Sequence, residues 1–497
     1  MKTSSSNFLR ILGIVLISTQ NIAGQVYLDQ IYSGVAHNFS LEGSLKLLNL
    51  AGKQPDYVQN IYTVAYNTLS VDPQNTFSDL AGNNEFVQLC QSNGMILTGG
   101  PMLGNITSDG VKIWVRTLYP ARVEVQVAVE NTHKIYGPVN STKESDLTAV
   151  VDVSGLKPGI QYPYRIFIDG KPVNLDVETF FKTLPPENQP VKTNIVFGSC
   201  FHRVGLCNKR LAKQIETANP SAFLINGDIA VQDRKNNIAM HRADYLLRDF
   251  HPAWKKLVAT IPVYTTWDDH DYFDDDLYNI PKGYTQKDKE SVCKIFRTSW
   301  NNPPYGIKGD HGGVFFRTRI GPADVIMLDN RYFREHGNFL GDEQMKWLEE
   351  QLLDCKGPFI ILSNGTMWSD YVSDGKDSWG VFDPEGREKI FNLIEKNKIG
   401  GVLLISGDRH GARGFKIPRP SGFNFYEFEP ACLGGRVGPP AIRSDWKTQL
   451  FGISGEYAFG KFAFDTTLPD PEVTFSLINE FGIIFYEITL SRSQLTP

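Results

Sequence analysis

The pattern of hydrophobic and polar positions separates three kinds of sequence along the chain. Between residues 25 and about 95, leucines and tyrosines recur at helical spacing in SLKLLNL, DYVQNIYTVAYNTL and FVQLCQ, which predicts a few helices. From about 96 to 184, segments such as RVEVQVAVE alternate apolar and polar residues between Gly and Pro, which predicts a small β-sandwich. After residue 190, apolar strands alternate with helical segments, which predicts a layered α/β domain.

The first residues have the layout of a secretory signal. Lys2 and Arg10 precede a short apolar stretch, Ile11–Ile17, and small residues follow up to a suitable cleavage position near Gly24. The stretch is too short to span a bilayer, and a buried N-terminal helix is the alternative. The sequence therefore predicts a secreted or periplasmic protein with a signal peptide at 1–24, a helical extension at 25–95, a β-sandwich at 96–187 and an α/β domain at 190–497.

The predicted strands of the last unit end in residue types that bind metals. A single Asp after a strand is common as a turn or helix-capping residue. Several strand ends that together carry Cys, His, Asp and Asn point instead to one site at the carboxyl edge of a sheet. The candidate ligands are Cys200 and His202 in GSCFH, Asp228 in NGD, Asp269 in WDDHD, Asn364 in SNG, and Asp408 and His410 in GDRH.

The chemistry of these side chains narrows the kind of site. Sulfur, nitrogen and oxygen ligands together favour a transition metal such as iron or zinc, beside a second, harder ion. Cys200 would ligate as the thiolate, because a metal holds it deprotonated. Two ions that share a carboxylate suit in-line displacement at phosphorus, since they offset the charge that makes phosphate esters resist attack.

Several motifs, in order and with the right intervals, resemble the alkaline phosphatase D (PhoD-type) metallophosphoesterases. The resemblance runs from about residue 96 to beyond 410 through TGGPMLGNITSDGVKIWVRT, FGSCFH, NGDIAVQD, WDDHDY, LDNRYF, LGDEQMKWLEEQL and SGDRH. It implies a layered α-β-β-α catalytic domain, preceded by a fibronectin- or Ig-like sandwich. In LKPGIQYPYRIFIDG, Leu156 and Tyr162 resemble the tyrosine corner of fibronectin type III-like domains.

The resemblance also implies which residues hold each ion. Cys200, His202, Asp228 and His410 would form the first site, and Asp228 would bridge to a second site. That second site would take its other ligands from Asp269, Asn364 and Asp408. One position departs from the family, because Val231 stands where a tyrosine often binds iron. The first ion would therefore depend on His202, and its identity as ferric iron stays open.

Three further residues are candidates for catalysis. His270 is expected to act as a general acid or transition-state donor, because an imidazole titrates near the working pH. Asp271 would either orient it or lie in an exposed turn. Arg331 and Arg409 are candidate phosphate clamps, since a guanidinium matches two phosphate oxygens, and surface salt bridges are the alternative.

Composition excludes several functions. The formal net charge of −5 offers no basic surface for nucleic acid, and six cysteines in 497 residues do not make a disulfide scaffold.

The stretch WDDHDYFDDD is either a solvated loop or, as the resemblance implies, a place for calcium, with Asp274 and Asp276 spaced to face one ion.

These observations predict a secreted, metal-dependent phosphoesterase that acts on small phosphate mono- or diesters at a binuclear site. A phosphotriesterase or phospholipid-directed hydrolase of the same fold is the nearest alternative. A non-catalytic binding protein with a decayed site is another, but Cys200, Asp228, His270 and His410 are all present, which argues against it.

Overall fold

The computed structural model describes residues 38–187, 189–309, 312–370, 378–438 and 447–497. The predicted signal peptide lies outside these ranges. None of the helices within them combines the length and the apolar character that a bilayer crossing requires. All the cysteines lie within the described ranges, and none of them forms a disulfide.

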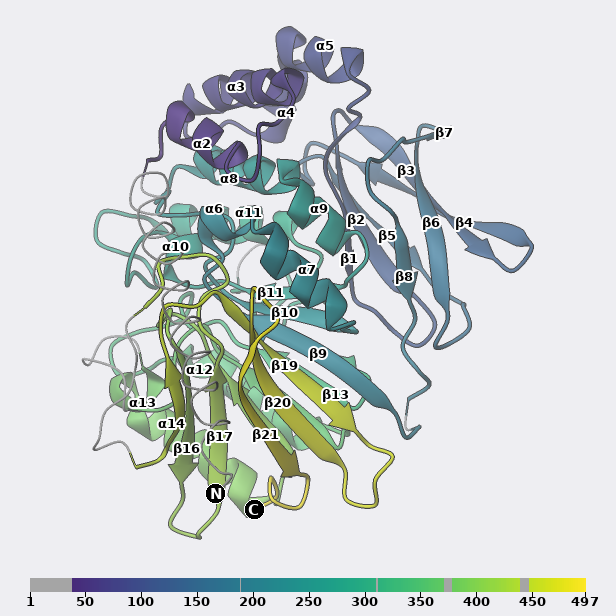
Figure 1. Cartoon of the computed structure of the whole chain (residues 1–497). Coiled ribbons are helices and arrows are strands. Elements are labelled where there is room, and N and C mark those ends of the chain that lie inside the picture. The colour runs from purple at the N-terminus through teal and green to yellow at the C-terminus, as the bar shows by residue number, and fades with distance from the viewer. Residues whose placement is uncertain (1–37, 188, 310–311, 371–377, 439–446) are drawn as a thin grey trace, which may run out of the picture.

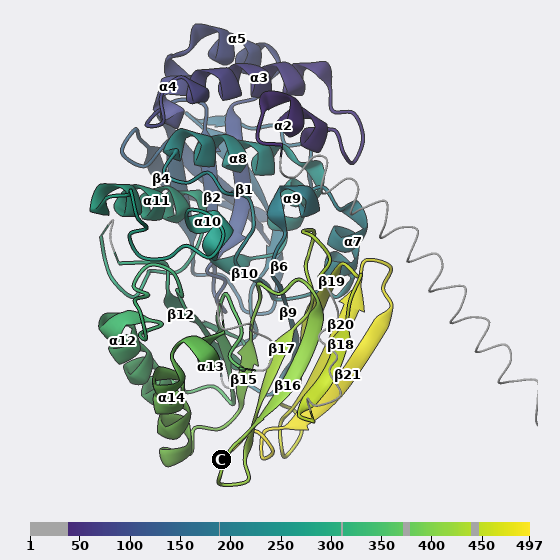
Figure 2. The same ribbon diagram turned by 90° about the vertical axis from the view of Figure 1, so that its left-hand side faces the viewer.

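A group of short helices covers one end of the molecule. Side chains cap three of them: the Ser40 hydroxyl accepts a hydrogen bond from the Gly43 amide, Thr76 and Asp79 form a capping box, and the Asn83 side chain accepts from the Phe86 amide. Their apolar faces pack on helix α8 (Ile238–Phe250), as Figures 1 and 2 show. The helices of this group are α2 (Leu41–Leu48), α3 (Asp56–Ser70), α4 (Phe77–Gly82) and α5 (Asn84–Ser92).

The alternating segments that follow form two antiparallel sheets that face each other. Every second side chain points inward and is buried, as in strand β3, because side chains alternate along a strand. The Tyr162 hydroxyl accepts a hydrogen bond from the Lys157 amide over 3.0 Å, as in a tyrosine corner. The sheets comprise β1 (Leu97–Gly104), β2 (Val111–Thr117) and β5 (Thr148–Val153), and β3 (Ala121–Val129), β4 (Thr132–Ser141), β6 (Gln161–Ile168), β7 (Lys171–Pro172) and β8 (Phe180–Lys182).

The rest of the chain is a four-layer α-β-β-α structure built on two larger sheets. One sheet has the strand order β11-β10-β9-β19-β20-β21, and the other has the order β12-β13-β14-β15-β17-β16-β18. The strands are β9 (Lys192–Gly198), β10 (Ala222–Asn226), β11 (Val263–Thr266), β12 (Phe316–Ile320), β13 (Ala323–Met327), β14 (Phe359–Ser363), β15 (Val402–Ile405), β16 (Ala412–Pro418), β17 (Asn424–Glu429), β18 (Gln449–Ile453), β19 (Ala458–Asp465), β20 (Glu472–Asn479) and β21 (Ile484–Ser491).

The two sheets pack face to face through aromatic side chains. Phe428 on β17 stacks on Phe475 of β20, with 4.3 Å between ring centroids, and Phe462 contacts both. Helices α7 (Lys209–Thr217), α8, α9 (Pro252–Val258) and α11 (Gln286–Ser299) lie outside the first sheet (Figure 1), and α12 (Gly341–Asp354) and α14 (Pro384–Lys396) lie outside the second (Figure 2). The predicted layered fold is therefore the observed one.

Short helices interrupt the loops at the carboxyl ends of the strands. β9, β10 and β11 run parallel to one another, and so do β13, β14 and β15, so the loops that follow them meet at one edge. These loops contain α6 (His202–Gly205), α10 (Asp269–Tyr272) and α13 (Trp379–Phe382).

Candidate metal centre

The predicted metal ligands all lie in loops at this edge. In the six-stranded sheet the loops follow β9, β10 and β11, and in the seven-stranded sheet they follow β14 and β15. In that order they carry Cys200 and His202, Asp228, Asp269, Asn364, and Asp408 and His410.

Three neighbouring groups of side chains could each hold an ion, because the ligand atoms within each group lie within 4.8 Å of one another. The first and second groups share Asp228, and the second and third share Asp269, so the groups form one continuous centre. The groups are Cys200, His202, Asp228 and His410; Asp228, Asp269 and His270; and Asp268, Asp269 and Asp408.

The backbone of this centre is held in an unusual conformation. The φ angles of Cys200, His202, Asp228, Asp408 and His410 are 53°, 46°, 55°, 75° and 60°. Residues other than glycine adopt this left-handed region rarely, and such strain gathers at functional sites. Hydrogen bonds fix the loops against each other: the His202 amide donates to the Asp228 carbonyl over 2.7 Å, and the Cys200 amide donates to the Gly227 carbonyl over 3.1 Å.

The first group places its donor atoms at the distances expected around an ion. The Cys200 Sγ atom lies 3.5 Å from Asp228 Oδ2, and the Nε2 atoms of His202 and His410 lie 3.4 Å apart. Burial, followed by the charge of Asp228, raises the pKa of the Cys200 thiol well above its usual value. Burial lowers the pKa of His410 to about 4, so its ring is neutral and able to bind a metal.

The donor set fits a pair of cations. Burial raises the pKa of Asp228 well above its usual value; His270 opposes the rise, and the neighbouring carboxylates, Asp269 first, add to it. A cation would relieve this crowding of negative charge. Two buried acceptor atoms, Oδ1 of Asp228 and Oδ1 of Asn364, have no hydrogen-bond partner among the described residues, as expected for ligand atoms.

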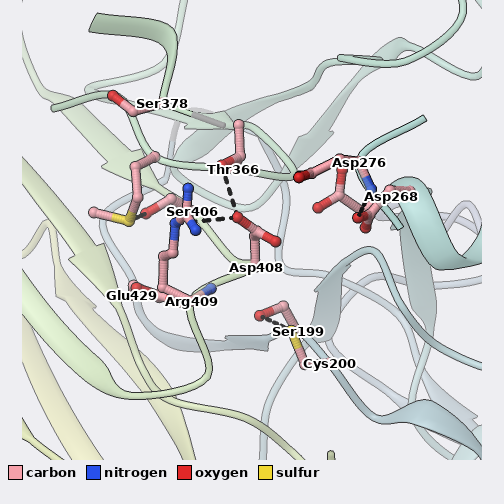
Figure 3. A network of polar contacts seen from close by, with 12 residues as sticks. Ser199, Cys200, Asp268, Asp276, Thr366, Ser378, Ser406, Asp408, Arg409 and Glu429 are labelled. Atoms are coloured by element: carbon pink, nitrogen blue, oxygen red, sulfur yellow. Dashed lines mark hydrogen bonds and ion pairs between the residues drawn. The ribbon is translucent and has the colours of Figure 1, made fainter. Parts of the chain in front are cut away.

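The ligands proposed for the second ion are held by neighbouring loops. Asn364 Nδ2 donates to the Thr366 carbonyl over 3.0 Å, and the Thr366 hydroxyl donates to Asp408 Oδ2 over 3.2 Å. Asp269 Oδ2 accepts a hydrogen bond from the Asp276 amide over 2.7 Å. Figure 3 shows Asp408 with Thr366 and Arg409 on one side and Asp268 on the other, and with Ser199 and Cys200 below it.

The two candidate phosphate clamps lie in different environments. Arg331 is fully buried, and its Nε atom donates to Asp268 Oδ1 over 2.5 Å, so it supports the loop that carries Asp269. Arg409 is 24% exposed, and its Nε atom lies 3.2 Å from Asp408 Oδ2. Arg409 is therefore the arginine of this pair that a substrate can reach.

Comparison with known proteins identifies the domain that carries most of this centre, from Asp228 to His410. The sequence model of the PhoD-like phosphatase family matches residues 226–435. The chain carries a PhoD-like phosphatase domain. A second model, for a domain of unknown function, matches residues 95–185, which contain the β-sandwich.

A curated relative and two solved structures agree with this domain. Alkaline phosphatase D of Bacillus subtilis is 25% identical over 390 residues, which cover 63% of this chain and 64% of the relative. A structure of PhoD aligns over 80% of this chain and 90% of its own, with a TM-score of 0.66 and 17% identity. Purple acid phosphatase from yellow lupin aligns over 79% and 74%, with a TM-score of 0.59 and 16% identity. The predicted family and fold are confirmed, and the family model and the curated relative are those of phosphatases, in agreement with the predicted enzyme class.

The PhoD-like phosphatase domain contains a partner for His270 that the sequence did not reveal. His270 Nδ1 lies 2.5 Å from Asp233 Oδ1, whereas Asp271 accepts a hydrogen bond from the Ile229 amide. Burial opposes protonation of His270, but Asp269, Asp228 and Asp233 outweigh it and raise its pKa well above the usual value. Asp233 lies five residues after Asp228 in NGDIAVQD, and only its place within that motif could have indicated it.

The position at which the family often has a tyrosine holds no ligand. Val231 is fully buried there in an apolar cluster, so the first group relies on His202.

The acidic loop, residues 267–276, contains a fourth group of ligand atoms, in which Asp275 and Asp276 join Asp269. Asp274 instead pairs with Lys235, with 3.3 Å between charged atoms, so the expected pairing of Asp274 with Asp276 around one ion is not the arrangement found.

Proposed function

We propose that this protein is a metal-dependent phosphoesterase that hydrolyses phosphate mono- or diesters at a centre of two cations. The observation that carries the proposal is that Asp228 belongs both to the group with Cys200, His202 and His410 and to a group with Asp269, and that Asp269 in turn belongs to a group with Asp408. A shared carboxylate between two groups is what a binuclear centre requires.

Each ion has a proposed set of ligands. Cys200, His202, Asp228 and His410 would hold the first, for which the sulfur and nitrogen atoms favour iron or zinc. Asp228, Asp269, Asn364 and Asp408 would hold the second, for which the oxygen atoms favour a hard divalent cation. When bound, two such ions lower the pKa of a water molecule and offset the charge of the phosphate.

The remaining side chains bind the ester and move a proton. Asp233 holds the His270 ring by its Nδ1 atom, which leaves Nε2 to donate a proton to the departing oxygen. Arg409, which is partly exposed, would bind the phosphate oxygens. Arg331 fixes Asp268, and through it the backbone that presents Asp269 and His270.

Calcium in the acidic loop is part of the proposal. Asp269, Asp275 and Asp276 supply oxygen ligands, which favour calcium over zinc. The signal-like layout of residues 1–24 further supports export, so that the enzyme works outside the cytoplasm on small phosphate esters.

Hydrolysis of p-nitrophenyl phosphate and of its bis ester tests the proposal. We expect turnover of one or both at neutral to alkaline pH once iron, zinc and calcium are supplied, and none by the Asp228→Asn variant. A phosphotriester and a phospholipid in the same panel separate the related hydrolases. If no ester is turned over although the protein binds metal, it is a binding protein and the proposal is wrong.

A further inference from the structure

Helix α8 lies in the interior, although it carries several charged residues. All of its residues from Ile238 to Phe250 are buried, because helices α2 to α5 cover the side of α8 that faces away from the catalytic sheets (Figures 1 and 2). Charged side chains in such a place need partners, since an unpaired buried charge is strongly destabilising.

One carboxylate on α8 holds two arginines from the loops of the metal centre. Arg203 Nε lies 3.1 Å from Asp244 Oδ1, and Arg234 donates to both Asp244 oxygens over 2.7 and 2.9 Å. Arg203 and Asp244 are fully buried. Two positive charges thus share one negative charge, and the remaining guanidinium hydrogens require neutral acceptors.

The N-terminal helical region supplies two of those acceptors. Arg203 Nη2 donates to the Ser44 hydroxyl over 2.6 Å, and Arg234 Nη1 donates to the Phe39 carbonyl over 3.3 Å. The Phe39 ring lies against both guanidinium groups, at 5.1 Å from Arg234 and 6.0 Å from Arg203. Ser44 is fully buried in the middle of α2.

Arg203 is next in the chain to His202, and the two residues open the single turn of helix α6. That turn is short, and its first residue has a left-handed backbone, so it has little intrinsic stability. The hydrogen bond from the His202 amide to the Asp228 carbonyl holds the start of the turn, and the Arg203 side chain adds a second point of attachment.

We propose that helix α2 is a positioning element of the metal centre: the Ser44 hydroxyl fixes Arg203, and Arg203 fixes the turn that presents His202 to the first ion. The inference rests on the proposed function in that His202 must be a ligand. It gives the N-terminal helical region a task in the chemistry, beyond packing. Without the Ser44 hydroxyl, a buried guanidinium hydrogen loses its acceptor, and the turn gains freedom to move.

Ser44→Ala is the test, and Ser40→Ala is its matched control. Each variant removes one hydroxyl, Ser44→Ala from within α2 and Ser40→Ala from its N-cap. The Ser40 hydroxyl bonds to Asn38 and to the Gly43 amide rather than to Arg203. The zinc-loaded protein is diluted into a chelator, and the rate of zinc loss from the first site is measured beside the unfolding temperature. We expect about tenfold faster loss for Ser44→Ala and less than a twofold change for Ser40→Ala.

The outcomes separate the inference from the proposed function. Equal rates of zinc loss in the two variants overturn the inference. A wild-type protein that binds no zinc or iron contradicts the proposed function instead. If Ser44→Ala does not fold, Arg203→Lys takes its place, because lysine keeps the charge near Asp244 but cannot also reach Ser44; unchanged zinc loss then overturns the inference. For Ser44→Ala and for Arg203→Lys, we expect backbone hydrogen exchange in α6 to be faster than in wild type, with the other helices unchanged.

Discussion

Gly435 lies so close to His202 that any side chain at position 435 would displace the His202 imidazole. A Cβ atom built at this position would lie 2.7 Å from His202 Nε2 and nearer still to Cδ2. Non-bonded heavy atoms prefer separations of about 3.5 Å, so Gly435→Ala would push the ring by about 1 Å. The glycine amide also donates to the Cys200 carbonyl over 2.9 Å, which ties the two loops together and limits how far they can separate.

The expected loss of metal affinity follows from how precisely the ligands of a metal site must be placed. Ligands must lie within about 0.5 Å of their working position, so a shift of about 1 Å removes His202 as an effective ligand. With Val231 unable to substitute, the first site keeps Cys200, Asp228 and His410. We expect the affinity for zinc or iron at this site to fall by about 10- to 100-fold, and kcat to fall with it.

Metal titration of the apoprotein measures the affinity, and turnover of p-nitrophenyl phosphate measures kcat. Gly82→Ala is the control, because a Cβ there meets nothing within 4 Å. Thermal unfolding identifies a general loss of stability. Wild-type affinity in a folded Gly435→Ala protein would refute the assignment of His202 as a ligand.

Three further substitutions test other parts of the centre, and a change of pH tests two buried histidines outside it. Asp228→Asn should lower kcat at least a hundredfold and release both ions in metal analysis, because one carboxylate serves two sites. Asp233→Asn should lower kcat about tenfold with KM unchanged, since a charged hydrogen bond to His270 becomes neutral; a change confined to KM would contradict this. Asp276→Asn should weaken the rescue of chelated enzyme by calcium, and equal rescue would leave the acidic loop as a solvated one. Burial lowers the pKa values of His241 and His251 to about 4, so below about pH 6.5 both are neutral in the folded protein but charged in the unfolded one. The free energy of unfolding should therefore fall between pH 6.5 and 4 by roughly 3 kcal/mol per histidine. Urea titrations at several pH values measure this dependence, and an unchanged dependence in His251→Gln would contradict the prediction.

The fold and the candidate ligands followed from the sequence because both depend on local signals. Strands such as β9 and β10 are short apolar runs, and parallel strands place their carboxyl ends at one edge, so residues just after them must meet. Cys200, Asp228 and His410 are each two to five residues beyond a strand, and the structure brings them together. The resemblance to a known family then supplied the proposed ligand sets.

Contacts between distant parts of the chain could not be predicted in this way. Ser44 and Arg203 are 159 residues apart, and nothing in either neighbourhood indicates the other. Arg331 looked like a substrate clamp because arginine binds phosphate well, but its burial against Asp268 depends on how two loops pack. Asp233 rather than Asp271 reaches His270 because the loop after β10 turns back through left-handed residues, which a spacing rule does not encode.

The backbone of the centre also argues against a decayed site. Cys200, His202, Asp228, Asp408 and His410 all have left-handed φ angles. Each costs about 1 kcal/mol or more relative to glycine, which adopts this conformation freely. A loop that served only as a turn would be more stable with glycine at these positions. The chain instead carries a thiol, two imidazoles and two carboxylates there, as expected of a site whose side chains serve a function.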